Sequence, residues 1–331
     1  MTSRETANGT TKQRTEHLYD EFDRLYIQRW NIDGKTRSEK YTYDDAESGD
    51  GALTQFKSGS GHKINYTYDA LRRLTTASVT NSSNVELFKT AYAYLTLSGS
   101  QTSTLVQYRS VRAPNGTLLM GHRYYYDAIG NITKIVNTET GYTAAEYTYD
   151  NQNQLTQVIY YTDTGAVDDT YTYTYDTAGN IRTEAENGTT IKTYTYGDTD
   201  WVDLLTAVNG NAITYDASGN PLTYHNGTTS YTNLTWQQGR QLTSITTGGK
   251  TATYSYDADG IRTQKVVDGV THTYVTQNGK LVRESFPYGD TTIIMDFIYD
   301  ESRLSCCGAR KNLRAYAIPR FFRPLPLARL L

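Results

Sequence analysis

Tyrosine followed by aspartate recurs along this chain, and a phenol beside an acid is a pairing that could transfer protons. The pairs are Tyr43-Asp44, Tyr68-Asp69, Tyr126-Asp127, Tyr149-Asp150, Tyr175-Asp176, Tyr215-Asp216 and Tyr256-Asp257. The fullest copies read Tyr-x-Tyr-Asp-x-x-Gly-Asn-Ile, at residues 124–132 and 173–181. A unit that returns about every 20 to 26 residues indicates a repeat architecture, so a structural role for the pair is favoured over a catalytic one.

Other patterns that carry chemistry are missing. The chain has no Gly-x-Ser-x-Gly elbow, and both Gly59-Ser60-Gly61-His62 and Leu97-Ser98-Gly99-Ser100 are typical of flexible turns. It has neither a phosphate-binding loop nor a dinucleotide fingerprint. We therefore expect no catalytic residue and no cofactor, and we predict that the chain is not an enzyme.

Metal ligation could come from three sets of side chains, and none is favoured. The turn aspartates could pool oxygens for Ca²⁺, but each turn offers one Asp, so hydrogen bonding inside the turn is the preferred interpretation. The only cysteines, Cys306-Cys307, exclude a disulfide framework and leave a vicinal redox pair or a soft-metal site as the alternative. The histidines lack ligand spacing and are expected on strand faces: His17, His62, His122, His225 and His272.

The three tryptophans are candidates for stacking on sugar rings, because an indole offers a flat apolar face. They are Trp30, Trp201 and Trp236. Packing inside a sheet is the favoured alternative for each of them.

The elements that position these residues are strands and tight turns. In Tyr-x-Tyr-Asp the two tyrosines point to one face of a strand, and Thr148 or Thr174 between them points to the other. Aspartate at the first position of a turn can accept a hydrogen bond from the backbone two residues on. Glycine three residues after it, as at Gly130 and Gly179, can take the positive φ that closes a hairpin with a bulge. Each repeat should therefore hold about two strands and two turns.

Composition supports an all-β chain. Of 331 residues, 37% are hydrophobic and 31 are tyrosine, so tyrosine must form much of the core. Apolar spacing follows the period of strands, and no apolar run approaches the roughly 20 residues that span a bilayer. The start of the chain is polar and lacks a secretory signal, which indicates a cytoplasmic nascent protein or a true start further upstream.

The chain divides into three expected parts. Residues 1–14 form a polar N-terminal segment, and residues 15–300 form the repeat array, in which 70–125 is the least regular stretch. Residues 301–331 form a basic tail outside the repeat, with seven Lys/Arg and one acid, and its foreign composition suggests an out-of-frame sequence. The tail could be interpreted as a nucleic-acid or acidic-membrane segment, but the rest of the chain carries a net −9 and would repel phosphate, so no nucleic-acid partner is predicted.

The motif Tyr-x-Tyr-Asp-x-x-Gly-Asn resembles the YD repeat of bacterial Rhs proteins, whose relatives include the C components of toxin complexes and the teneurins. The resemblance covers about residues 15–300. It implies a β-sheet ribbon that spirals into a solenoid or shell, of which this chain would be part of the wall. The shell would enclose the protein's own C-terminal toxin for delivery to competing cells.

The family pattern continues, after a stretch like residues 298–301, with further repeats, a self-cleaving aspartyl region and the effector. This chain departs from that pattern at Ser302, so we expect a fragment truncated before the effector. The resemblance also implies a secreted or cell-surface protein. The alternative function is a cell-surface or wall-associated module that binds glycans or proteins.

Overall fold

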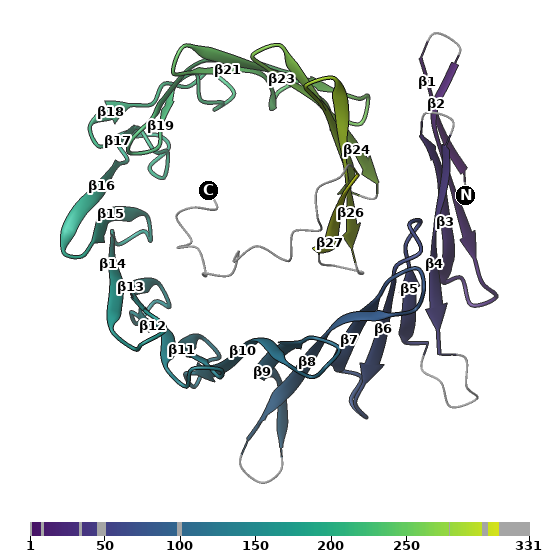
Figure 1. The fold of residues 1–331 in the computed structure, drawn as a ribbon. Coiled ribbons are helices and arrows are strands. Elements are labelled where there is room, and N and C mark those ends of the chain that lie inside the picture. Colours follow the sequence, from purple (N-terminus) through teal and green to yellow (C-terminus); the bar gives the residue numbers. More distant parts are fainter. Residues whose placement is uncertain are drawn as a thin grey trace. The chain divides into compact units, whose positions relative to one another are not determined.

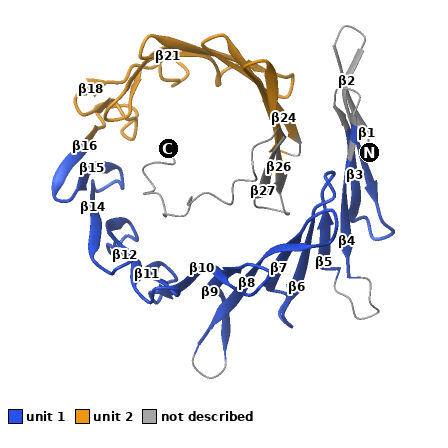
Figure 2. Ribbon diagram, in the orientation of Figure 1, with its two compact units in different colours: residues 1–192 blue, residues 193–331 orange. Residues whose placement is uncertain are grey.

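The computed structural model describes residues 2–7, 10–32, 35–44, 51–97, 101–277, 279–299 and 304–310. These residues form β-strands joined by turns (Figure 1). The chain divides into two compact units, residues 1–192 and residues 193–331 (Figure 2). The predicted all-β repeat architecture is confirmed.

Unit 1 is a succession of antiparallel strands in which each strand from the first to the fifteenth pairs with the next along the chain. Short hairpin connections make this order the simplest one. The strands are β1 (Thr2–Ala7), β2 (Thr10–Tyr19), β3 (Leu25–Ile32), β4 (Lys35–Tyr43), β5 (Leu53–Lys57), β6 (Lys63–Tyr68), β7 (Leu74–Thr80), β8 (Glu86–Thr96), β9 (Thr102–Arg112), β10 (Leu118–Tyr126), β11 (Ile132–Asn137), β12 (Thr143–Tyr149), β13 (Leu155–Tyr161), β14 (Val167–Tyr175) and β15 (Ile181–Glu186).

Unit 2 begins inside β16 (Thr189–Thr195), which pairs with β17 (Ala207–Val208). Its short strands come first, and a longer antiparallel meander follows from β19 to β27. The remaining strands are β18 (Asn211–Ala212), β19 (Tyr224–His225), β20 (Ser230–Gln237), β21 (Gln241–Thr247), β22 (Lys250–Tyr256), β23 (Arg262–Val267), β24 (Val270–Gln277), β25 (Lys280–Tyr288), β26 (Thr291–Tyr299) and β27 (Leu304–Arg310).

The two faces of the unit 1 sheet differ in composition. We call the face with Tyr147, Val158, Tyr171 and Tyr173 the tyrosine face. Tyr147 lies opposite Val158 and Val158 lies opposite Tyr171, while Tyr173 is two residues after Tyr171 on β14. Val158, Tyr171 and Tyr173 are buried there and Tyr147 packs against them, so tyrosine rings do supply the core. The opposite side, the threonine face, carries pairs such as Thr174 with Thr183.

Residues 70–125, the stretch in which the sequence repeat is least regular, hold β7 to β10, and β8 and β9 are eleven residues long. Their connections lack the Tyr-Asp pair but reproduce its turn with other residues. Asn81, for example, donates its backbone N–H to Val85 O and accepts from Ser83 N and Val85 N through Oδ1. The shortest described strands, β17 to β19, lie at residues 207–225.

Both ends of the expected array reach strand structure in the described residues. β1 and most of β2 lie within residues 1–14, and β27 carries the pairing of β26 into the basic tail. Residues 311–331 and Ser98–Ser100 lie outside the described residues. The interpretation of residues 301–331 as an out-of-frame sequence stays a prediction.

A search for helices that are long and apolar enough to cross a membrane identified none in the described part of the chain.

Candidate functional site: the Tyr-Asp turns

The turn at Asp127 shows how the repeated pair works. The Asp127 backbone N–H donates to Asn131 O at 3.0 Å, and Gly130 N–H donates back to Asp127 O at 3.2 Å. The Asp127 Oδ1 atom accepts from Ile129 N at 3.0 Å and from Asn131 N at 2.9 Å, while Oδ2 accepts from Asn131 Nδ2 at 2.9 Å. The carboxylate is therefore engaged by the turn that it closes.

The same arrangement recurs at five other aspartates of the series and at Asp20, which follows Tyr19, while the loop after Asp44 lies outside the described residues. Each accepts, through Oδ1, a backbone N–H from two residues on and another from four residues on: Asp20, Asp69, Asp150, Asp176, Asp216 and Asp257. The predicted role of aspartate in the turn is confirmed. Because the carboxylate already accepts these bonds, it is poorly placed to act as a metal ligand or a general base.

The residue three positions after the aspartate has a positive φ in every one of these turns. Glycine takes this place at Gly130 (φ 96°) and Gly179 (φ 90°), as predicted. The copies without glycine keep the same backbone, with φ values of 59° at Asp23, 63° at Arg72 and 64° at Asn153. A left-handed residue of this kind after a tight turn makes the bulge that appears as a register shift in each ladder.

Hydrogen bonding favours the ionised form of the carboxyl groups of Asp69 and Asp216. At Asp69 the bonds from the Arg73 side chain and backbone hold the pKa of the carboxyl below its usual value. At Asp216 the side-chain and backbone bonds from Asn220 do the same. A carboxyl group with a lowered pKa is a poor general acid near neutral pH, so the geometry does not support proton transfer by the pair.

The tyrosine of each pair reaches a backbone carbonyl of an earlier repeat. Tyr149 Oη donates to Ile132 O at 2.9 Å, and Ile132 is the residue at which β11 starts after the Asp127 turn. The same bond joins Tyr43 to Leu25 O, Tyr68 to Leu53 O, Tyr94 to Leu74 O, Tyr126 to Val106 O, Tyr175 to Leu155 O, Tyr215 to Leu205 O and Tyr256 to Leu242 O. We call this bond the tyrosine link.

The tyrosine link ties successive turns together. Burial raises the pKa of Tyr126 and of Tyr175, so both phenols stay neutral donors. Phenol and carboxylate in a pair thus serve different partners: the carboxylate closes its own turn, and the phenol binds the previous one. The repeated pair is a joint between repeats.

Two of the three tryptophans, Trp30 and Trp236, make contacts within the sheet. Trp30 is buried in β3. Trp236 occupies the tyrosine position of its repeat, and its Nε1–H donates to Pro221 O at 2.8 Å, where Pro221 follows the Asp216 turn as Ile132 follows the Asp127 turn.

Trp201 differs, since 46% of it is exposed. Its ring lies against the turn at Gly219, where an added Cβ would come within 2.7 Å of the indole. It therefore covers a glycine that no larger residue could replace without moving the ring.

The five histidines are dispersed and have separate partners. His62 Nδ1 contacts Ser60 Oγ at 3.0 Å, and His225 Nδ1 accepts from Gly227 N at 3.1 Å. His272 Nδ1 lies 2.7 Å from Glu284 Oε1. Burial lowers the pKa of both His17 and His122. Within the described ranges, no three His, Cys, Asp or Glu side chains are placed to hold a metal ion.

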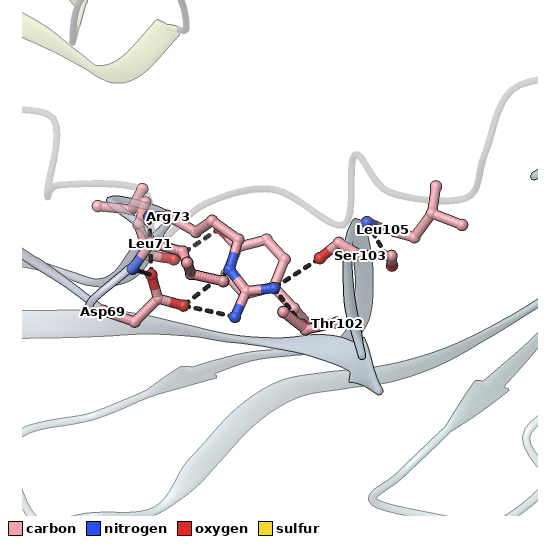
Figure 3. Close-up of polar contacts among 8 residues, drawn as sticks. Asp69, Leu71, Arg73, Thr102, Ser103 and Leu105 are labelled. Carbon is pink, nitrogen blue, oxygen red and sulfur yellow. Dashed lines mark hydrogen bonds and ion pairs between the residues drawn. The ribbon is translucent and has the colours of Figure 1, made fainter. Parts of the chain in front are cut away.

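Sequence reasoning missed the arginines that join neighbouring segments. Arg73 Nε donates to Asp69 Oδ2 at 2.7 Å, and its Nη1 donates to Ser103 O at 2.6 Å at the start of β9 (Figure 3). Its guanidinium also lies 4.3 Å from the ring centroid of Tyr94. The available signal was an Arg four residues after the turn aspartate, which recurs at Arg24 after Asp20.

A comparison with models of known protein families finds a match, and the matched residues include two of these turns. Residues 126–166, which include the turns at Asp127 and Asp150, match the model of the RHS repeat family. This match confirms the resemblance to Rhs and YD-repeat proteins that the motif indicated.

Curated relatives match over a limited stretch. The chain is 32% identical over 139 residues to the tRNA3(Ser)-specific nuclease WapA of Bacillus spizizenii, which is 38% of this chain and 6% of that protein. It is 34% identical over 140 residues to the tRNA nuclease WapA of Bacillus subtilis, again 6% of that protein. The chain thus spans only a small part of the curated relatives that it matches.

A solved structure shares the fold. The crystal structure of TcdB2-TccC3-Cdc42 superposes with a TM-score of 0.51 at 17% identity, over 88% of this chain and 18% of that chain. The long antiparallel sheets built from successive hairpins therefore also occur in the TcdB2-TccC3-Cdc42 structure.

Proposed function

We propose that this chain is a non-enzymatic structural segment of an Rhs-type toxin, and that its sheets form part of the wall of a shell around a C-terminal effector. The tyrosine link carries this proposal. It recurs from turn to turn and engages the conspicuous side chains of the sequence in building the sheet, so it provides a wall and leaves no obvious reactive group.

The comparisons support the proposal from two sides. An RHS repeat lies within the array, and the solved toxin-complex component supports the fold. The partner proposed for the wall is the effector of the same polypeptide, and the proposed location is outside the producing cell or at its surface.

Enclosure is tested by protease protection in a longer protein that contains this chain and its effector. We expect the effector region to resist trypsin in the intact protein. Replacing Asp127, Asp150 and Asp176 together by Ala removes the acceptors of three consecutive turns and should expose the effector. An effector that is cleaved equally fast with and without these substitutions would contradict enclosure.

The non-enzymatic part of the proposal has its own test. Since two relatives are named as tRNA nucleases, the purified chain is incubated with total tRNA and with divalent metal ions, and the products are resolved on a denaturing gel. We expect intact tRNA. Cleavage that co-purifies with the chain through two chromatographic steps would show that it is an enzyme.

A further inference from the structure

One arginine on the threonine face has aromatic neighbours but no acceptor. The guanidinium carbon of Arg123 in β10 lies 5.2 Å from the ring centroid of Tyr108 and 4.8 Å from that of Tyr125. Its Nε atom is covered and has no hydrogen-bond partner, and no ion pair of Arg123 is found in the described part of the chain. A guanidinium has five N–H donors, so this group is held in place with its hydrogen-bonding capacity unused.

Two other arginines that lie over tyrosine rings differ from Arg123 in being paired with a carboxylate. Arg24 lies 4.6 Å from the Tyr43 centroid and is bonded to Asp20, and Arg73 lies over Tyr94 and is bonded to Asp69. Both are therefore neutralised inside the array. Arg123 also lies over tyrosine rings, but no carboxylate is paired with it among the described residues.

Glu146 of β12, an acid on the same face, is already engaged. Lys134 lies opposite Tyr125, and its Nζ is 3.0 Å from Glu146 Oε1. Glu146 Oε2 also accepts from Tyr161 Oη at 2.7 Å. These bonds hold the pKa of Glu146 below its usual value, with the Tyr161 bond as the main cause. Glu146 is thus an ionised acceptor committed to Lys134 and Tyr161.

The two rings beside Arg123 are open to solvent. Tyr108 in β9 and Tyr125 in β10 are each 37% exposed. On the β8 side, Tyr108 lies opposite Ala93, whose methyl group covers little of the ring. Flat aromatic surface next to a positive donor is suited to a ligand that combines a C–H face with an anion.

We propose that Tyr108, Arg123 and Tyr125 form a binding site for an acidic saccharide, in which a pyranose ring rests on a tyrosine and its carboxylate binds the Arg123 guanidinium. A phosphate polymer fits less well, because Lys134, which lies opposite Tyr125, is already paired with Glu146. This site is independent of the proposed shell function, since it depends only on one surface of unit 1.

A second arginine, Arg262 in β23, lies 5.2 Å and 5.7 Å from the ring centroids of Tyr254 and Tyr274. Those rings are less exposed than Tyr108 and Tyr125. The proposal is therefore confined to Arg123.

The test is a titration of the full chain with a galacturonic acid trimer, followed by isothermal calorimetry at about 0.15 M salt. Galactotriose, which lacks the carboxylates, is the ligand control, and a tri-aspartate peptide tests whether any carboxylate suffices. We expect the acidic trimer to bind at least about tenfold more tightly than galactotriose and the peptide.

Three variants locate the site. Arg123→Gln and Tyr108→Ala should each weaken binding of the acidic trimer at least about tenfold. Arg29→Gln is the matched control, since Arg29 lies on the same face but is paired with Glu16 at 3.2 Å, and it should bind as the parent does. Circular dichroism confirms that each variant keeps the strand content.

Several results would overturn the proposal. They are absence of binding by the acidic trimer, equal binding of acidic and neutral trimers, tighter binding of the aspartate peptide, or unchanged binding by folded Arg123→Gln. Equal losses of affinity for the acidic trimer in Arg123→Gln and Arg29→Gln would show a general effect of charge and would also contradict the proposed site.

Discussion

At the residue scale, the pair that first suggests chemistry is divided between two structural tasks. In the repeat at Tyr175-Asp176, the carboxylate accepts from Ala178 N and Asn180 N, and the phenol donates to Leu155 O at 2.8 Å. A catalytic pair would need both groups aimed at one substrate atom. Here the two groups bind different turns, which is a reason to look for function elsewhere on the chain.

The tyrosine link predicts the effect of removing one oxygen. Tyr175→Phe keeps the ring but leaves Leu155 O without this donor, so we expect unfolding free energy to fall by about 0.5–1.5 kcal/mol. Urea denaturation followed by circular dichroism measures the change. The control is Tyr288→Phe, because Tyr288 is 70% exposed, and it should be neutral. Equal effects at both positions would argue against the link.

Acid should weaken the turns. The folded pKa of Asp216 is lowered from 3.8, chiefly by the Asn220 side-chain bond, so its stabilising effect is complete above the unfolded pKa. That effect is lost as the pH falls through the still lower folded pKa. We therefore expect the melting temperature to change little between about pH 5 and 7 and to fall below about pH 4.

The variant Asp216→Asn assigns part of this effect to one turn. Asn cannot lose a charge, so the melting-temperature gap between variant and parent should be widest near neutral pH and should narrow as the pH approaches about 3. Differential scanning calorimetry across the pH series measures the gap. A gap that is constant over the whole series would mean that Asp216 ionisation does not stabilise the turn.

At the element scale, the hairpin turn requires one residue with a left-handed backbone conformation, and that residue does not have to be glycine. Gly179 (φ 90°) and Asn153 (φ 64°) hold equivalent places in neighbouring repeats. Asparagine tolerates this region of backbone space better than other residues that carry a Cβ. The array can therefore lose a glycine from its motif and keep the same turn.

Substitution at Gly179 separates backbone strain from crowding. An added Cβ there would meet only Gln154 Nε2, at 3.8 Å, so crowding is small. Gly179→Ala should cost about 1–2 kcal/mol through the positive φ, and Gly179→Asn should cost clearly less. Urea unfolding of both variants measures the difference. Similar losses for Ala and Asn would show that something other than φ limits this position.

At the scale of the whole molecule, each repeat is joined to its neighbours by the same contacts, so stability should follow repeat boundaries. Deleting residues 150–175 brings Tyr149 directly before Asp176 and restores the motif from Tyr147 to Ile181. Tyr149 keeps its bond to Ile132 O, and Ile181 can replace Leu155 opposite Tyr149. We expect this deletion to fold with the circular dichroism spectrum of the parent.

Deleting residues 150–162 is the matched control. It removes β13 and the turn before it. β12 and β14, which run in the same direction, are then joined only by residues 163–166. A parallel connection needs a much longer crossover, so this protein should aggregate or lose strand content. Size-exclusion chromatography with circular dichroism compares the two. A folded half-repeat deletion would contradict the nearest-neighbour description of the array.

The amino-acid sequence by itself determined the all-β class, the alternation of strands and turns, and the parts of Asp127 and Gly130 in a turn, because these depend on neighbours a few residues apart. Only the tertiary structure showed the acceptor of each tyrosine, since Tyr175 and Leu155 are 20 residues apart in sequence. It likewise placed Trp236 in a tyrosine position and gave residues 70–125 their long strands.

The same distinction applies to function. The motif indicated a structural repeat, and its resemblance to the YD repeat led to the proposal of a shell wall. The Arg123 site could not be predicted, because the register of β9 and β10 brings Tyr108 and Arg123 opposite each other, and because Glu146 is bonded to Lys134 of β11 and Tyr161 of β13. Sequence determines which groups a strand presents to each face, and register decides which of them remain without a partner.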